Sequence, residues 1–316
     1  MKPTHYNLTV TPAAAGLRLD QFVAAQCPDI SRTLARRLID LGGLHAGGRR
    51  VSQCSRGAVC GETVELFIDG LSLDLYVLTP ADILYRDDYL LALDKPAGIE
   101  TQPTPARYKG TLYAALLEYL RDPRHSARKT ELGMVQRLDR DTSGVILFSI
   151  HPRAHAGLTK IFSERSARKI YLALVSGVPA EAQGEIRSHL ARGRDNRVRS
   201  VPRGGKEALT RYRVVETFAD AALLEIELLT GRSHQIRAHL SEAGHPLLGD
   251  IRYGGWAELR GETVPRQMLH SASLALQHPV GGKPLVLEAP LPADFLACLQ
   301  RLQPPQPASG TKDTAC

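Results

Sequence analysis

The chain has few cysteines and no long apolar run, and each absence narrows what the protein can be. The five cysteines are odd in number and scattered: Cys27, Cys54, Cys60, Cys298 and Cys316. They offer neither a disulfide framework nor a paired Cys-x-x-Cys metal site, which fits a reducing cytosol. No stretch approaches the roughly 18 consecutive apolar residues that span a bilayer. The first ten residues lack an apolar core of signal-peptide length. We therefore expect a cytoplasmic protein with no membrane partner.

The composition is that of a globular chain with a moderate excess of positive charge. Hydrophobic residues make up 43% and charged residues 23% of the 316 residues, which are ordinary values for a folded protein. A chain of this length can hold one large domain and one small one. The net charge of +7 favours an anionic partner without identifying it.

The most informative segment is QRLDRDTSG, residues 136–144, in which Asp139 lies between Arg137 and Arg140. The four apolar residues that follow, 145–148, have the length of a buried strand and place the acidic cluster in a loop beside the core. Neighbouring positive charge keeps a carboxylate ionised. Such a carboxylate can be a nucleophile, or it can be only a loop salt bridge. The segment alone leaves both interpretations open.

Six segments together resemble the motifs of the RluA family of RNA pseudouridine synthases, and they occur in the family's order. They read DKPAG (94–98), QRLDRDTSG (136–144), KIYLALVSG (169–177), GRSHQIRAHL (231–240), HPLLGD (245–250) and LHSA (269–272). The strands expected from the sequence are mostly joined by turns, with helices outside, which predicts an α+β fold on a mixed, largely antiparallel sheet. The family's fold is of this kind. The resemblance implies an isomerase that converts uridine in RNA to pseudouridine.

The resemblance also implies roles for individual residues. Asp139 matches the family's nucleophilic aspartate, and attack on the sugar, attack on the base and proton abstraction all remain open as its first step. Arg237 matches an arginine that pairs with this aspartate. Tyr171 matches a tyrosine whose ring can stack on the base and whose hydroxyl can assist proton removal. Arg137 matches an arginine that can fill the space left by a flipped-out base, with a plain phosphate contact as the alternative.

Three further residues are expected to support this site from behind: Lys95, Gln136 and His234. Gln136 is a departure, because the family usually has histidine there. His234 and His239 are five residues apart and do not share a helical face, so we expect no metal. Residues 204–207 do not match a phosphate-binding loop. An isomerisation needs no redox carrier or energy source, and we expect no cofactor.

Residues 17–69 form a smaller unit that resembles the RNA-binding module first described in ribosomal protein S-four. Ser31 is expected to cap a helix whose leucines recur at i, i+4 and i+7. Arginine gathers there, with Arg32, Arg36, Arg37, Arg49, Arg50 and Arg56. The planar guanidinium donates two hydrogen bonds to one phosphate. We therefore expect RNA contacts from the first five, with a solvated helix face as the alternative.

A second basic stretch, residues 187–213, holds nine basic residues against two acidic ones. Its glycines and proline predict an exposed, mobile loop. We expect it to follow RNA phosphates near the active cleft, with Arg197 and Arg199 among the contacts. A solvated loop without RNA contact is the alternative.

The chain thus divides into an N-terminal arm (1–16), the small module (17–69), a linker (70–80), a catalytic domain (81–303) and a disordered tail (304–316). We expect a monomer that acts on large-subunit ribosomal RNA, because an appended RNA-binding module suits a large folded RNA. A transfer RNA substrate remains open. So does an RNA-binding assembly factor with incidental catalysis.

Overall fold

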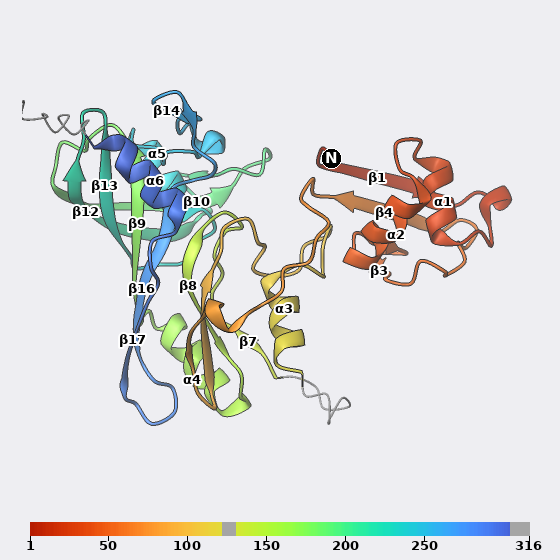
Figure 1. Ribbon diagram of the computed structural model, residues 1–316, viewed down its shortest axis with the longest axis horizontal. Coiled ribbons are helices and arrows are strands. Elements are labelled where there is room, and N and C mark those ends of the chain that lie inside the picture. Colours follow the sequence, from red (N-terminus) through yellow and green to blue (C-terminus); the bar gives the residue numbers. More distant parts are fainter. Residues whose placement is uncertain (122–130, 304–316) are drawn as a thin grey trace, which may run out of the picture.

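The computed structural model describes residues 1–121 and 131–303, which form a small N-terminal module and a large domain (Figure 1). The predicted tail, residues 304–316, lies outside the described residues. The module's sheet has the order β1-β4-β2-β3, and the strand within residues 1–16 is an edge strand of this sheet. The module's elements are β1 (Thr4–Thr9), α1 (Leu19–Gln26), α2 (Arg32–Leu41), β2 (Leu44–Ala46), β3 (Arg49–Arg50) and β4 (Thr63–Ile68).

Helix α2 begins where the sequence predicts. The Ser31 hydroxyl oxygen accepts a hydrogen bond from the Leu34 backbone N–H at 3.2 Å, which caps the first turn. Gly42 ends the helix with a φ of 95°, in the left-handed region that glycine adopts at little cost. Leu38 is buried in the module core together with Leu66 of β4. The predicted cap and helix are confirmed.

The large domain is built on an 11-stranded sheet with the main order β11-β10-β12-β13-β9-β16-β8-β6-β5. In the described chain, β8 and β16 run parallel and the other neighbours run antiparallel. The predicted α+β fold with a mixed, largely antiparallel sheet is confirmed. Its strands are β5 (Ile83–Arg86), β6 (Leu90–Lys95), β7 (Gly133–Met134), β8 (Ser143–Ser149), β9 (Arg168–Ser176), β10 (Gln183–Arg192), β11 (Val198–Ser200), β12 (Lys206–Thr217), β13 (Ala221–Leu228), β16 (Leu269–Gln277) and β17 (Pro284–Glu288).

The parallel pair β8–β16 is a short join near the middle of the sheet. Two residue pairs make it, Ser143 with His270 and Gly144 with Ser271. Gly144 has a φ of 107°, and a Cβ added there would lie 2.2 Å from the Ser271 carbonyl oxygen. A side chain at this position would therefore force the two strands apart. The Ser271 hydroxyl donates to the Val145 carbonyl at 3.1 Å and reinforces the join.

Helices cover both faces of the sheet and bury β6 and β8 on two sides. Leu91 and Ile146 belong to the core beneath α3 and α5, whereas Leu90 and Leu147 belong to the core beneath α4. Two-sided burial explains the uninterrupted apolar runs in these strands. Among the described residues, no helix has the length and apolar character needed to cross a membrane. The helices are α3 (Leu112–Tyr119), α4 (Pro152–Ser163), α5 (Gln235–Glu242) and α6 (Ala293–Leu302).

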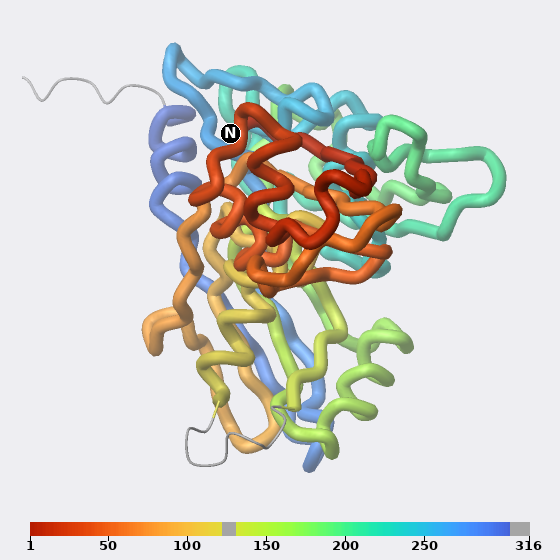
Figure 2. Tube along the Cα trace, turned by 90° about the vertical axis from the view of Figure 1, so that its right-hand side faces the viewer, coloured from red at the N-terminus to blue at the C-terminus, as the bar shows by residue number. Residues whose placement is uncertain are grey.

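The basic stretch 187–213 is not the mobile loop that its glycines predict. It forms most of β10, all of β11 and two thirds of β12, paired in antiparallel ladders. Leu190, Ala208 and Thr210 are buried, while the arginines between such positions are exposed, as expected for a half-buried strand. The glycines and the proline fall between the strands, and the turn region between β10 and β12, coloured green to cyan, projects from the body of the molecule (Figure 2).

The module touches the large domain through the segment that precedes α3. The Tyr108 backbone N–H donates to the carbonyl of Leu41, the last residue of α2, at 2.6 Å. The Arg50 guanidinium donates to the Thr104 carbonyl at 2.6 Å. These bonds attach the end of α2 and strand β3 to the part of the large domain that leads into its cleft.

Candidate active site

A cleft of about 1060 Å³ opens over the core beneath α3 and α5, where segments distant in sequence meet. It extends from Arg192, at the end of β10, to Thr104 beside the module. Most of the residues expected at the site line it, namely Gln136, Arg137, Asp139, Tyr171, His234 and Arg237. Lys95 lies behind the wall instead.

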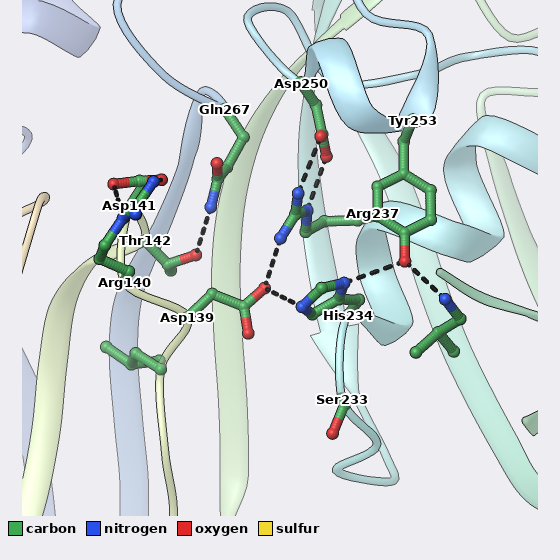
Figure 3. Close-up of polar contacts among 12 residues, drawn as sticks. Asp139, Arg140, Asp141, Thr142, Ser233, His234, Arg237, Asp250, Tyr253 and Gln267 are labelled. Atoms are coloured by element: carbon green, nitrogen blue, oxygen red, sulfur yellow. Dashed lines mark hydrogen bonds and ion pairs between the residues drawn. The ribbon is translucent and has the colours of Figure 1, made fainter. Parts of the chain in front are cut away.

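The Asp139 carboxylate is paired with Arg237 inside the cleft (Figure 3). The Arg237 Nη1 donates to Asp139 Oδ2 at 3.0 Å, and its Nε and Nη2 donate to the two carboxylate oxygens of Asp250 at 2.7 and 2.9 Å. Burial opposes the charge on Arg237, but the hydrogen bonds to Asp250 outweigh it and raise the Arg237 pKa. The Asp139 side chain is 28% exposed, so the carboxylate is both held by Arg237 and reachable from the cleft.

The loop that carries Asp139 is held by hydrogen bonds to its backbone. The Lys95 side chain is fully buried and its Nζ donates to the carbonyls of Arg140 and Thr142 at 2.7 and 3.0 Å. Burial lowers the Lys95 pKa to about 7. The Thr101 hydroxyl donates to the Leu138 carbonyl at 2.7 Å. The carbonyls on both sides of Asp139 are thus fixed, which keeps an irregular segment rigid.

His234 lies next to Asp139, just before α5. It has a φ of 50°, in the left-handed region that non-glycine residues adopt only when the surroundings require it. Its Nε2 is 3.9 Å from Asp139 Oδ2 and its Nδ1 is 2.9 Å from the Tyr253 hydroxyl. Burial lowers the His234 pKa, and Asp139 only partly opposes this. Burial therefore favours the neutral form of His234.

Tyr171 presents a buried phenol to the cleft. It lies on β9, opposite Ile226 on one side and Ser271 on the other. Its residue surface is 6% exposed, and burial raises its pKa to about 12. The hydroxyl therefore stays protonated at neutral pH, which leaves it able to donate a hydrogen bond while the ring offers a flat surface for stacking.

Gln136 and Arg137 differ sharply in their surroundings. The side-chain nitrogen of Gln136 is buried and has no hydrogen-bond partner among the described residues, an arrangement that native structures seldom leave in place. Arg137 is exposed, and its guanidinium reaches the Ser233 hydroxyl at only 3.4 Å. Gln136 thus belongs to the wall of the cleft and Arg137 to its mouth.

Sequence reasoning missed two residues that organise the site, Asp250 and Tyr253. Asp250 binds Arg237 through two hydrogen bonds, and the Tyr253 ring lies 4.9 Å from the Arg237 guanidinium. Asp250 ends the HPLLGD segment, so a signal was present at that position. Nothing in the pattern indicated that its partner would be an arginine 13 residues earlier.

Arg266 was also missed, and it joins the loop of Asp139 to the strand β16. Its guanidinium donates to the carbonyl of Asp141 at 2.9 Å and to that of Leu269 at 3.2 Å. It also pairs with Asp294 at 2.6 Å. A buried arginine with its donors used in this way fixes the distance between the two segments.

The module's arginines gather around one buried carboxylate. The Asp20 side chain has no exposed surface and accepts hydrogen bonds from the Nε atoms of Arg18, Arg32 and Arg36 at 2.9, 3.1 and 2.7 Å. Burial opposes the charge, but these bonds hold the Asp20 pKa well below its usual range. Arg32 and Arg36 remain 47% and 50% exposed. Their terminal nitrogens have no partner in the described part of the chain.

The other arginines expected to bind RNA have varied surroundings. Arg50 donates to the carbonyls of Gly42 and Thr104 at 2.7 and 2.6 Å and so connects the module with the large domain. Arg49 is exposed, and Arg37 is an exposed residue 3.6 Å from Asp74. Beyond β10, two half-exposed arginines approach Asp195: Arg197, in the turn, at 4.0 Å and Arg199, in β11, at 2.5 Å.

His239 is held by two hydroxyls. Its Nδ1 lies 2.9 Å from the Thr210 hydroxyl and its Nε2 lies 3.0 Å from that of Ser188. Across residues 1–121 and 131–303, no group of three or more histidine, cysteine, aspartate or glutamate side chains is placed to hold a metal ion.

Known proteins resemble the chain in both sequence and structure. A family described as RNA pseudouridylate synthase matches residues 89–242. An uncharacterized RNA pseudouridine synthase of Synechocystis is 35% identical over 90% of this chain and 89% of its own length. The ribosomal large subunit pseudouridine synthase D of Nitrosomonas europaea is 36% identical over 94% of this chain and 88% of its own length.

A solved structure, human RNA pseudouridylate synthase domain containing 4, matches with a TM-score of 0.56 at 26% identity, covering 70% of this chain and 93% of that one. The family match begins after the N-terminal module. Resemblance over nearly the whole of the curated relatives, together with one cleft that gathers the motif residues, settles the family. The chain belongs to the RluA family of RNA pseudouridine synthases, isomerases that act on uridines in RNA.

Proposed function

We propose that this enzyme uses Asp139 as its nucleophile and acts on uridines of large-subunit ribosomal RNA. The observation that carries the first part is the 3.0 Å contact between Asp139 and Arg237 in the cleft. The Arg237 guanidinium, held in place by Asp250, lies against the carboxylate and can stabilise its negative charge, and partial exposure leaves the carboxylate open to a substrate.

The chemistry of uridine isomerisation matches what the cleft offers. The uridine has to leave its stack before any group can reach it. An anion then has to attack the nucleotide or stabilise its electron-poor sugar, a task that carboxylates perform in glycosidic chemistry. Asp139 supplies the anion. Tyr171 supplies a flat ring beside it and a protonated hydroxyl that can donate to the detached uracil.

We propose that Arg137 occupies the space left by the flipped nucleotide. It is exposed at the mouth of the cleft and close to Ser233, so its guanidinium is free to enter a helix of RNA. Basic groups lie beyond both ends of the cleft. Arg197 and Arg199 are in the projecting region between β10 and β12, and Arg32, Arg36, Arg37 and Arg49 are on the module. Phosphate contacts on both sides would hold an RNA across the nucleophile.

Relatives named as ribosomal large subunit pseudouridine synthase D support the choice of RNA. They come from Nitrosomonas europaea, Zymomonas mobilis and Xanthomonas campestris and are 36%, 35% and 37% identical to this chain. Each match includes more than 90% of this chain, so the matched region extends from the catalytic part into the N-terminal module.

Replacing Asp139 by asparagine tests the nucleophile. The Asp139→Asn variant should lose pseudouridine formation by roughly a thousandfold or more, as expected when a nucleophile is removed, and should still bind RNA. Asp141→Asn is the matched control, because Asp141 lies in the same loop and its carboxylate pairs with Arg140. Retained modification by the Asp139→Asn variant would refute the assignment.

Mapping pseudouridines in ribosomal and transfer RNA, with and without the gene, tests the substrate. We expect the loss of specific pseudouridines in large-subunit RNA and their return on complementation. Loss confined to transfer RNA would assign the enzyme to that substrate instead. An unchanged map in both would favour a binding role without catalysis.

A further inference from the structure

We propose that Tyr253 is a positioning residue whose hydroxyl fixes the tautomer of His234 and directs the Nε2–H of that histidine at Asp139. The inference deepens the proposed function, because it matters for catalysis only if Asp139 is the reacting group. Tyr253 ends a single 3-10 turn, η4 (Ile251–Tyr253), that follows directly on Asp250.

The hydrogen bonds around the Tyr253 hydroxyl determine where its proton lies. The Val198 backbone N–H, at 2.9 Å, can only donate, so the hydroxyl oxygen accepts there. The only other partner of this hydroxyl in the described part of the chain is His234 Nδ1, at 2.9 Å. A buried hydroxyl is seldom left without an acceptor, and Nδ1 is the acceptor that the described chain offers, so we assign the hydroxyl proton to this contact. Figure 3 shows the two groups facing each other.

This arrangement determines the tautomer of His234. A neutral imidazole that accepts at Nδ1 carries its proton on Nε2. That nitrogen is 3.9 Å from Asp139 Oδ2, and the histidine side chain is 16% exposed. The distance is longer than a hydrogen bond, and catalytic contacts often tighten only when the substrate binds.

The two groups that approach Asp139 share one target atom. Arg237 Nη1 donates to Oδ2 at 3.0 Å, and His234 Nε2 faces the same oxygen. Oδ1 has no donor in the described part of the chain. Because both groups face Oδ2, Oδ1 is the carboxylate oxygen that remains available to the nucleotide.

Tyr253 contacts both of these donors. Its hydroxyl binds His234, and its ring packs 4.9 Å from the Arg237 guanidinium. The residue is 8% exposed, so the ring has little freedom to move. Through Val198 it also holds the strand β11, next to the arginines of the projecting turn. If Tyr253 served only to anchor β11, the bond to Val198 would be sufficient. This purely structural role is the alternative to be tested.

The test compares Tyr253→Phe with the wild-type enzyme. Phenylalanine retains the ring against Arg237 and removes only the hydroxyl. We expect kcat to fall about tenfold, the effect of losing roughly one hydrogen bond, with KM within about twofold. Nitrogen-15 NMR of the histidines at neutral pH should show His234 protonated at Nε2 in the wild type and a mixture of tautomers in the variant. The matched control is Tyr85→Phe, which removes a hydroxyl bonded to Asp87 at 2.7 Å and should change neither readout.

A second variant keeps the idea testable if Tyr253→Phe folds poorly. His234→Gln should lower kcat by a similar factor, and Tyr253→Phe added to it should lower kcat no further, because the hydroxyl acts through the histidine. A wild-type His234 protonated at Nδ1 would overturn the proposal, and so would an unchanged kcat in Tyr253→Phe. A rise in KM alone would show that the hydroxyl only anchors β11. The tautomer readout does not depend on Asp139, so failure of the nucleophile assignment would be seen separately in the Asp139→Asn variant.

Discussion

The N-terminal module and the sheet face of β9, β10, β12 and β13 are both rich in arginine, but they neutralise it differently. In the module three guanidiniums share the single carboxylate of Asp20. On the sheet face each arginine has a glutamate on a neighbouring strand, in the pairs Arg168–Glu227, Arg187–Glu207, Arg211–Glu185 and Arg213–Glu225.

The two arrangements differ in how much unneutralised positive charge they leave for contacts with RNA phosphates. The sheet face is a ladder of opposite charges with little net charge, each pair worth roughly 0.2–1 kcal/mol to the sheet. In the module three guanidiniums surround one carboxylate, so positive charge is in excess there, and the buried carboxylate of Asp20 orients the guanidiniums. The number of arginines in a stretch is therefore a poor measure of its capacity for phosphate, and the partners of each arginine decide the matter.

The largest difference in RNA affinity is expected when arginines are removed from each region in turn. Arg32→Gln with Arg36→Gln should weaken RNA binding by roughly one to two orders of magnitude and reduce the slope of log K against log salt by about one for each lost phosphate contact. Arg211→Gln with Arg213→Gln should change affinity by less than about threefold, because these cations are already paired. RNA titrations at several salt concentrations give both quantities, and thermal unfolding checks that the variants fold. Equal losses in the two double variants would contradict the distinction.

Removing the shared carboxylate should have a smaller effect, mainly on the module's stability. Asp20→Asn leaves three arginines without their common partner and should lower the free energy of unfolding by about 2 kcal/mol, below the full value for a buried pair because the arginines are partly exposed. The folded Asp20 pKa is lowered, so its contribution is complete above its unfolded pKa. That contribution is lost as pH falls below about 4.

Denaturant unfolding from pH 7 to pH 3 measures this dependence. The difference in the free energy of unfolding between wild type and Asp20→Asn should be constant near neutral pH and should become smaller below about pH 4. Asp29→Asn, an exposed change in the same module, should give no such gap. A gap that widened on acidification would have the wrong sign and would exclude a depressed folded pKa.

Removing one glutamate from the paired charges of the sheet face should have the smallest effect on RNA affinity. Glu227→Gln removes the partner that lies 3.3 Å from Arg168 and 3.9 Å from Arg211. RNA affinity at low salt should rise by about twofold and the gain should disappear at high salt, as for any exposed charge. Glu258→Gln, an exposed residue of β14 (Glu258–Leu259), is the control for a general change in net charge. An equal gain in affinity in both variants would mean that pairing with glutamate on the sheet face does not reduce RNA binding.

Local patterns predicted the parts of the fold that depend on neighbouring residues. The run in β8 is continuous because Val145 and Leu147 face one core and Ile146 and Phe148 face the other, so burial was readable without knowing the partners. The cap at Ser31 likewise depends on an N–H three residues away. The family resemblance supplied Asp139, Tyr171 and Arg237, which the structure gathers in one cleft.

Partners distant in sequence could not be predicted in this way. Glu185, Glu225 and Glu227 neutralise arginines of the stretch 187–213 from outside it, and only strand pairing shows this. The same holds for Tyr253, whose hydroxyl joins Val198 to His234 across 55 and 19 residues. The glycines of the basic stretch predicted mobility because turns and loops share the same composition.

The short join between β8 and β16 has a mechanical consequence. Asp139 precedes β8 on one side of the join, whereas Arg237 follows β13 on the other. If the two halves of the sheet bend or dock imperfectly along this line, the 3.0 Å contact between the carboxylate and the guanidinium changes at once, while nearly all strand pairing survives. Circular dichroism would then report an intact protein that has lost its turnover. For this enzyme, activity is a stricter measure of correct assembly of the sheet than secondary-structure content.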